Sequence, residues 1–60
     1  RLDIALAIQS LPDHYRAVIV LRDFEELSVQ EIATRLSLPA ATVKTRIHRG
    51  RHLIREHLLA

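Results

Sequence analysis

Apolar residues recur every three or four positions along most of the chain, and this spacing predicts amphipathic α-helices. The clearest segment follows Ser28, and its apolar residues share one helical face: Val29, Ile32, Ala33 and Leu36. Ser28 followed three positions later by Glu31 is the pattern of a capping box, in which each side chain bonds the backbone N–H of the other residue. A helix is therefore predicted to begin directly after Ser28.

The rest of the chain divides into three more predicted helices. The first covers about residues 2–10 and is apolar on nearly all sides. The second follows Leu11-Pro12 and runs to about Phe24, because the residue before a proline avoids the helical conformation and proline suits a first helical turn. The last runs from about Ala40 to Leu59. The fold class is thus predicted to be all-α, a four-helix domain.

The third and fourth predicted helices are joined by only three residues, Ser37-Leu38-Pro39. Ala33 is small where a second helix must cross closely, and Val43 is apolar where the last helix turns inward. This spacing predicts a helix-turn-helix over about residues 28–58. The turn requires a left-handed backbone at Ser37, where a residue other than glycine costs on the order of 1 kcal/mol.

Unwrapped at about 100° per residue, the last predicted helix has an apolar side and a basic side. Five residues form the inward stripe: Val43, Ile47, Gly50, Ile54 and Leu58. The opposite side carries hydrogen-bond donors: Lys44, Thr45, His48 and Arg49. Thr42 and Arg46 flank this side on one edge, and Arg51 and Arg55 flank it on the other. Donors in the first turns of such a helix can reach base edges in the major groove, so the pattern favours binding to double-stranded DNA.

Charge is concentrated in the same helix. Residues 41–60 carry five Lys and Arg side chains against one carboxylate, a net charge of +4. Residues 1–40 carry four Arg against six carboxylates, a net charge of −2. Such an asymmetry indicates that one element contacts a polyanion, although a solvated helix face would show the same pattern.

Length and composition exclude several classes of protein. The chain has 60 residues, which is room for one domain, and it has no cysteine. No apolar run approaches the roughly 20 residues of a membrane span. No acid, base and nucleophile stand at a recognisable catalytic spacing, so we expect no enzyme and no catalytic residue. The chain lacks an initiating Met and opens inside a predicted helix, so we expect it to be one domain, residues 1–60, of a longer protein.

The last helix has two rival interpretations. His48, His52 and Glu56 stand at i, i+4 and i+8 and could approach one metal ion, but nearby arginines would repel a cation. The helix is also basic and amphipathic, as membrane-surface helices are, yet its apolar stripe is needed to close the core. We therefore expect no metal, no cofactor and no membrane contact by this domain.

Taken together, the motifs resemble region 4 of bacterial sigma factors, most closely the extracytoplasmic-function (ECF) group. The residues that carry the resemblance lie between Leu11 and Arg55: Leu11-Pro12, Arg16, Leu21-Arg22, Leu27-Ser28, Glu31-Ile32-Ala33, Leu36, Thr42-Val43-Lys44-Thr45-Arg46 and His48-Arg49-Gly50-Arg51. The resemblance implies a cytoplasmic bacterial protein of transcription initiation whose last helix reads the −35 promoter element. It also implies docking on the flap of the RNA polymerase β subunit, and regulation by an anti-sigma factor.

The resemblance also implies a role for individual residues. The positions that contact bases fall on four residues of the basic side: Lys44, Thr45, His48 and Arg49. The positions associated with contact to the DNA backbone fall on three more: Thr42, Arg46 and Arg51. Three residues depart from the family pattern and affect the angle of the helix rather than a DNA contact: Ser37, Pro39 and Gly50.

Apolar residues on the first two helices predict a surface for a protein partner, because exposed apolar patches usually mark such sites. The predicted surface comprises six residues: Leu2, Ile4, Leu6, Ile8, Val18 and Leu21. Two alternatives stay open. The chain shares its Ser-x-x-Glu-Ile-Ala and Thr-Val-Lys elements with the DNA-binding output domain of LuxR-type response regulators, although the arginine-dense segment 46–51 favours a sigma factor. It could also act mainly as a protein-binding module.

Overall fold

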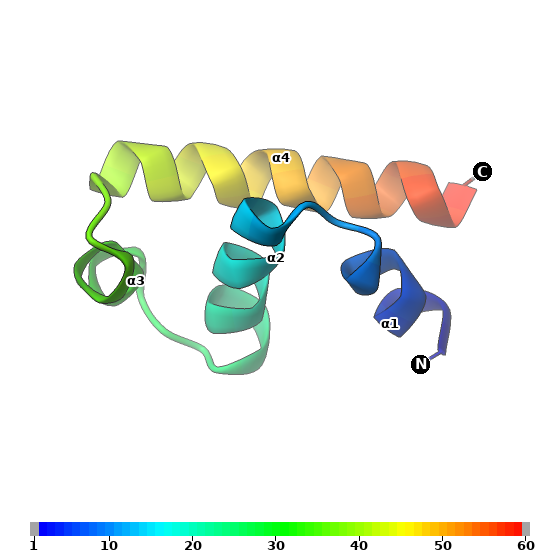
Figure 1. Ribbon diagram of the computed structural model, residues 1–60, viewed down its shortest axis with the longest axis horizontal. Helices are drawn as coiled ribbons and strands as arrows, with labels where there is room; N and C mark the ends of the chain where they lie inside the picture. The colour runs from blue at the N-terminus through cyan, green and yellow to red at the C-terminus, as the bar shows by residue number, and fades with distance from the viewer. Residues whose placement is uncertain (1, 60) are drawn as a thin grey trace.

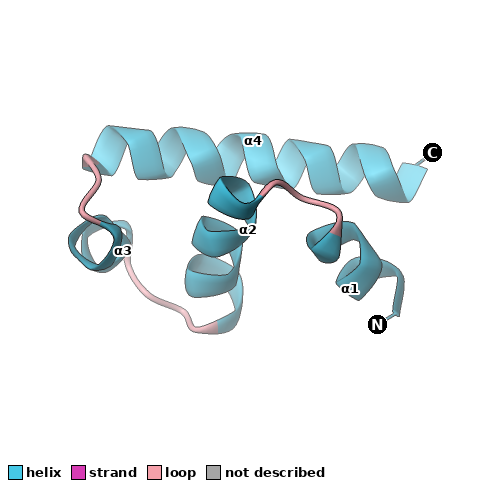
Figure 2. Ribbon diagram, in the orientation of Figure 1, coloured by secondary structure: helices cyan, strands magenta, loops and turns pink. Residues whose placement is uncertain are grey.

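A computed structural model describes residues 2–59 except for the side chain of Leu2. Within these residues the structure is helical, with no strand, and short loops join the helices (Figure 2). The elements in chain order are α1 (Leu2–Gln9), α2 (Asp13–Ile19), the π-helical segment η1 (Val20–Phe24), α3 (Val29–Leu36) and α4 (Ala40–Leu59). The prediction of an all-α domain with four helices is confirmed.

Helix α4 extends along the long dimension of the molecule, and the other helices lie along one side of it (Figure 1). Its 20 residues correspond to about 30 Å at 1.5 Å per residue, close to the longest extent of the domain, 33 Å. Helices α1, α2 and α3 each pack against α4, and α3 also contacts η1. Helix α4 is therefore the common support of the fold.

The core lies where α2, η1 and α3 meet the first half of α4. Seven buried residues form one cluster: Leu11, Val18, Ile19, Leu21, Ile32, Val43 and Ile47. Among the described side chains of α1, Ala7 is fully covered although most of the others are exposed. Aliphatic side chains alone fill this core, since no polar or charged residue among those described is buried. Hydrophobic burial is accordingly the main favourable term in folding.

The second predicted helix ends in a wider turn than its sequence pattern indicates. Its last residues form η1, in which the Glu25 N–H donates to the carbonyl of Val20 over 3.1 Å. The next bond runs further, from the Leu27 N–H to the carbonyl of Leu21, over 3.0 Å. Opening the last turn in this way satisfies helix-end carbonyls while the chain leaves for α3. Glu26 takes a positive φ of 60° in this turn, which the sequence pattern does not indicate because no glycine marks the position.

The capping box at the start of α3 is confirmed. The Glu31 N–H donates to Ser28 Oγ over 3.0 Å, and the Ser28 N–H donates to Glu31 Oε1 over 2.7 Å. Hydrogen bonding of the Glu31 carboxylate to Ser28, first to its backbone N–H and second to its side chain, holds the pKa of the Glu31 carboxyl below its ordinary value. At the other end of α3, Ser37 has φ 56° and ψ 46°, so the expected left-handed conformation is also confirmed.

The predicted inward stripe of α4 is correct for four of its five residues. Val43, Ile47 and Gly50 are buried and Ile54 is half-buried, but Leu58 is 45% exposed. The prediction for Leu58 is wrong because the periodic pattern continues beyond the part of α4 that α2 and α3 cover. A Cβ on Gly50 would lie 3.0 Å from Cγ1 of Ile19, so glycine permits the close crossing of α2 and α4.

Candidate nucleic-acid interface

The first half of α4 carries a row of exposed donor side chains. Lys44, Thr45, His48 and Arg49 are all exposed, and they stand on the side of the helix opposite to buried Val43. At about 100° per residue, the burial of one side places the other toward solvent. We call these four residues the donor ridge. Its side chains come from two successive turns of one rigid element, so their spacing is set by the helix itself.

A hollow of about 410 Å³ borders the donor ridge on one side. It is lined by residues of α2 and α4: His14, Tyr15, Ala41, Thr42, Thr45, Arg46 and Arg49. We call it the α2 hollow. Two of its lining residues, Thr42 and Arg46, are those that the sequence places on this flank of the helix. The contribution of His14 and Tyr15 was missed, since nothing in the sequence spacing indicates that α2 reaches this flank.

A second hollow, of about 430 Å³, borders the ridge on the opposite side. We call it the η1 hollow, and its lining residues come from η1, α3 and α4: Arg22, Val29, Lys44, Ile47, His48, Arg51 and Arg55. Arg22 is not among the site residues that the sequence predicts. A signal was nonetheless present, because Arg22 is a charged residue on the apolar stripe of its helix.

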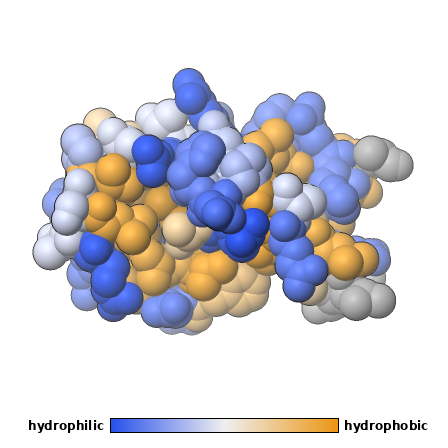
Figure 3. Space-filling model, in the orientation of Figure 1, coloured by the Kyte–Doolittle hydropathy of each residue, from blue (hydrophilic) through white to orange (hydrophobic). Residues whose placement is uncertain are grey.

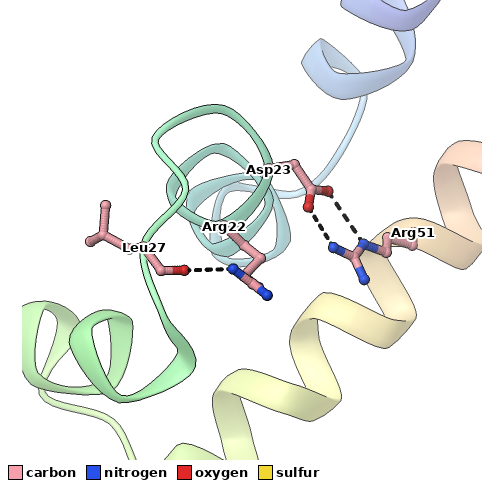
Figure 4. A network of polar contacts seen from close by, with 4 residues as sticks. All are labelled: Arg22, Asp23, Leu27 and Arg51. Carbon is pink, nitrogen blue, oxygen red and sulfur yellow. Dashed lines mark hydrogen bonds and ion pairs between the residues drawn. The ribbon is translucent and has the colours of Figure 1, made fainter.

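Arg51 does not stand free in the η1 hollow. Its Nε donates to Asp23 Oδ2 over 3.3 Å, and its Nη2 donates to Asp23 Oδ1, so the two side chains form a bidentate pair (Figure 4). The hydrogen bond to Asp23 raises the pKa of Arg51 further above its already high ordinary value. The neighbouring Arg22 donates from Nη1 to the carbonyl of Leu27 over 3.0 Å (Figure 4). Both arginines are therefore oriented by contacts within the domain.

The chain matches the sigma-70, region 4 family over residues 1–54. It belongs to this family. The resemblance predicted from the motifs is confirmed, and the match favours the sigma-factor reading over the response-regulator alternative.

Curated relatives place this region 4 domain among ECF sigma factors. The chain is 57% identical over 51 residues to the ECF RNA polymerase sigma factor SigW of Bacillus subtilis, and the match covers 85% of the chain and 27% of that protein. It is 46% identical over 56 residues to the ECF RNA polymerase sigma factor SigE of Mycolicibacterium smegmatis, covering 93% of the chain and 22% of that protein. It is also 40% identical over 53 residues to the RNA polymerase sigma-E factor of Streptomyces coelicolor, and this match covers 88% of the chain and 30% of that protein. The chain thus spans about a quarter of the length of these relatives.

The structure divides the predicted partner surface of this region 4 domain. Ile4 and Leu6 are 40% and 52% exposed, and Ile8 is half-buried. Val18 is 0% exposed and packs within the core cluster, so its assignment to the surface is wrong. Leu21 is also a core residue, at 9% exposure. The side chain of Leu2 lies outside the described residues. Helical periodicity could not make this division, because it does not tell which apolar side of a helix another helix covers.

Leu21 also lines a third hollow, of about 440 Å³, through the small part of its side chain that is exposed. We call it the apolar groove, and its lining residues come from α2, η1 and α3: Asp13, Arg16, Ala17, Val20, Leu21, Arg35 and Leu36. Asp13 and Arg35 are exposed, whereas the aliphatic lining residues are buried or half-buried. On the face drawn in Figure 3, hydrophobic residues are visible at the surface in patches between hydrophilic ones. Such a groove is suited to an apolar helix of a partner.

The other sequence-level candidates have simple structural descriptions. His52 Nε2 lies 3.4 Å from Glu56 Oε2, one turn along α4. Within residues 2–59 no three His, Asp or Glu side chains are placed to hold a metal ion together. None of the helices described here is both long and apolar enough to cross a membrane.

Proposed function

We propose that this domain recognises the −35 element of bacterial promoters, as part of a sigma factor that directs RNA polymerase to initiate transcription. The observation that carries the proposal is the donor ridge, which is exposed on a rigid helix whose opposite side is buried in the core. A helix presented in this way can enter the major groove with its donors toward base edges. The membership in the sigma-70 region 4 family supports the same reading.

The roles proposed for the ridge follow from the chemistry of each side chain. Lys44 and Arg49 donate to the O6 and N7 acceptors of guanine, Arg49 with two parallel bonds. Thr45 and His48 stand between them and each offer a donor or an acceptor to a base edge. Thr42, Arg46 and Arg51 contact backbone phosphates and set the register of the helix. Arg51 makes its contact with Nη1, since Nε and Nη2 each donate to Asp23 and neither N–H of Nη1 does.

The apolar groove is proposed as the docking site for the flap of the polymerase β subunit. Its aliphatic lining residues come from α2, η1 and α3, whereas the donor ridge belongs to the exposed side of α4. Separate surfaces allow one domain to bind polymerase and DNA together. An anti-sigma factor would then act by covering the groove, the exposed Ile4 and Leu6 of α1, or the ridge, and so would exclude polymerase or DNA by occlusion.

Selection of preferred sites from a pool of random duplexes tests the DNA-binding proposal. The unmodified chain is expected to enrich one short motif. Lys44→Ala and Arg49→Ala are each expected to relax the preference at one base position, by about 1–3 kcal/mol per lost bidentate contact. His57→Ala changes an exposed residue near the end of α4 and serves as the control. Unchanged motifs in both ridge variants would refute the assignment of base contacts.

An NMR titration with the isolated helix from the tip of the β flap tests the docking proposal. Saturable shifts are expected at Ala17, Val20 and Leu36 in the groove. Ala17→Arg should abolish them, whereas Leu59→Arg, at a residue 84% exposed and outside the groove, should not. Circular dichroism would verify that both variants remain helical. Binding that survives Ala17→Arg would place the docking site elsewhere.

A further inference from the structure

We propose that the α2 hollow binds a phosphate of the DNA strand across the groove from the η1 hollow, with His14 as a contact supplied by α2. This inference rests on the proposed binding of DNA by the donor ridge. It adds a residue outside the recognition helix to the interface, and it assigns one strand to each flank of α4.

The first support is the arrangement of the two hollows around α4. Thr42, Arg46 and Arg49 line one of them, whereas Lys44, Arg51 and Arg55 line the other. At about 100° per residue these two sets lie on roughly opposite sides of the helix, with the donor ridge between them. When a helix lies in a major groove, about 12 Å wide, the two sugar–phosphate backbones form the walls on either side of it. Each hollow therefore faces one backbone.

The second support is the charge of the α2 hollow. Arg46 and Arg49 line it together with His14, and no carboxylate is among its lining residues. The nearest acid along the chain, Asp13, pairs with Arg16 over 3.1 Å and lines the apolar groove instead. The η1 hollow differs, because there Asp23 binds Arg51. The α2 hollow thus has cationic side chains whose charge is not neutralised by a lining residue, and a phosphate supplies the missing anion.

The third support is the placement of His14 itself. Its ring packs against that of Tyr15, with the ring centroids 4.2 Å apart and the ring planes inclined by 39°. Tyr15 is partly buried and packs against the core cluster, so it holds the exposed imidazole at the edge of the hollow. An imidazole carries at least one N–H donor in either protonation state, so His14 can donate to a phosphate oxygen whether neutral or charged. Thr42 offers a second uncharged donor on the α4 side of the hollow.

Salt dependence of binding to a duplex of arbitrary sequence tests the inference, since each phosphate contact by a cation contributes about one unit to the slope of log K against log salt. His14→Arg is expected to raise the slope by about one and affinity by about threefold. His14→Glu is expected to lower affinity by at least about threefold. His57→Arg and His57→Glu make the same charge changes about 12 Å along α4 from Arg49 of the α2 hollow, beyond the Debye length at physiological salt, and should have much smaller effects.

Duplexes with single methylphosphonate groups then identify the phosphate. Neutralising one phosphate on the strand facing the α2 hollow should lower the affinity of the unmodified chain for the duplex. The same change should lower the affinity of His14→Ala by less. Neutralising a phosphate on the other strand should lower the affinity of both proteins for the duplex equally. His14→Gln, which keeps a donor, is a milder variant if circular dichroism shows that another substitution disturbs the helices.

The results separate this inference from the proposed function. If the His14 and His57 variants behave alike while Lys44→Ala and Arg49→Ala relax base preference, the phosphate site is refuted and DNA recognition by the ridge stands. If the unmodified chain binds no duplex, both proposals are overturned.

Discussion

The two halves of α4 belong to one continuous helix but are supported very differently. In the first half and as far as Gly50, α2 and α3 pack against the helix, and Val43, Ile47 and Gly50 are buried. In the second half, Leu53 and Ile54 are only partly buried, and Leu58 and Leu59 are 45% and 84% exposed. The donor ridge stands on the supported half. A surface that must recognise a rigid partner is thus placed where packing holds the helix, whereas the end of α4 lies beside the largely exposed α1.

The largest effect is expected from a charge placed in the first half of α4, compared with the same charge placed in the second half. Val43→Asp would bury a carboxyl group with no partner, at a cost comparable to the roughly 3–9 kcal/mol of stability typical of a 60-residue domain. Its helical circular dichroism at 25 °C should be lost. Leu58→Asp, at an exposed position of the same helix, should retain a spectrum close to that of the unmodified chain. Equal losses in the two variants would contradict the contrast between the halves.

The second prediction concerns the crossing of α2 and α4 at Gly50. Gly50→Leu should destabilise the domain by about 1–3 kcal/mol, because a Cβ already meets Ile19 Cγ1 at 3.0 Å and a larger side chain must displace it. His52→Leu introduces the same side chain two residues along, at a position 57% exposed, and should be nearly neutral. Urea unfolding followed by circular dichroism measures both. A Gly50→Leu protein as stable as the His52→Leu protein would show that α2 does not cross α4 so closely.

The third prediction concerns the start of α3, because Ile32 of α3 packs in the core cluster with Val43 and Ile47 of α4. Ser28→Ala should cost about 1 kcal/mol by removing the cap, whereas Thr34→Ala, at an exposed position within α3, should cost little. Hydrogen exchange should rise more at Val43 and Ile47 than at Leu58 if α3 supports that half. A uniform rise along α4 would instead indicate one cooperative unit.

The same cap has a defined pH dependence. The pKa of Glu31 is lowered in the folded chain from its ordinary value of 4.5, so the unfolded chain binds more protons in the acidic range. The stabilisation from this carboxylate is fully present above the unfolded pKa and is lost as pH falls through the folded pKa. Glu31→Gln should therefore flatten the fall of unfolding free energy below about pH 5. A pH profile identical to that of the unmodified chain would refute this role of the cap.

The smallest effect on stability is expected at the boundary of the two halves, where Arg51 binds Asp23. Both side chains are partly exposed, so Asp23→Asn should cost less than about 1 kcal/mol. It should also strengthen binding to duplexes of any sequence, because Arg51 then has all its donors available for phosphate. Asp3→Asn removes an exposed carboxylate from α1 and is the matched control. A drop in affinity with Asp23→Asn would indicate that the pair holds Arg51 in its binding position.

Local interactions explain why much of the domain could be predicted from its sequence. Helical periodicity and capping depend on residues within about four positions, as in the box formed by Ser28 and Glu31. The left-handed Ser37 and the basic side of α4 follow from the same kind of local pattern. The motifs that identified the family also lie within short segments. The sequence by itself therefore determined the helix positions, the turn between α3 and α4 and the donor ridge.

The tertiary structure decided which surfaces these helices cover and which side chains they bring together. Asp23 and Arg51 are 28 positions apart, and they meet only because η1 passes beside α4. His14 likewise lines the α2 hollow only because another element, α2, approaches α4 on that flank. Val18 and Leu58 have similar apolar patterns in the sequence, yet one is fully buried and the other is exposed. Periodicity determines which face of a helix is apolar, whereas burial depends on how far a neighbouring helix extends along that face.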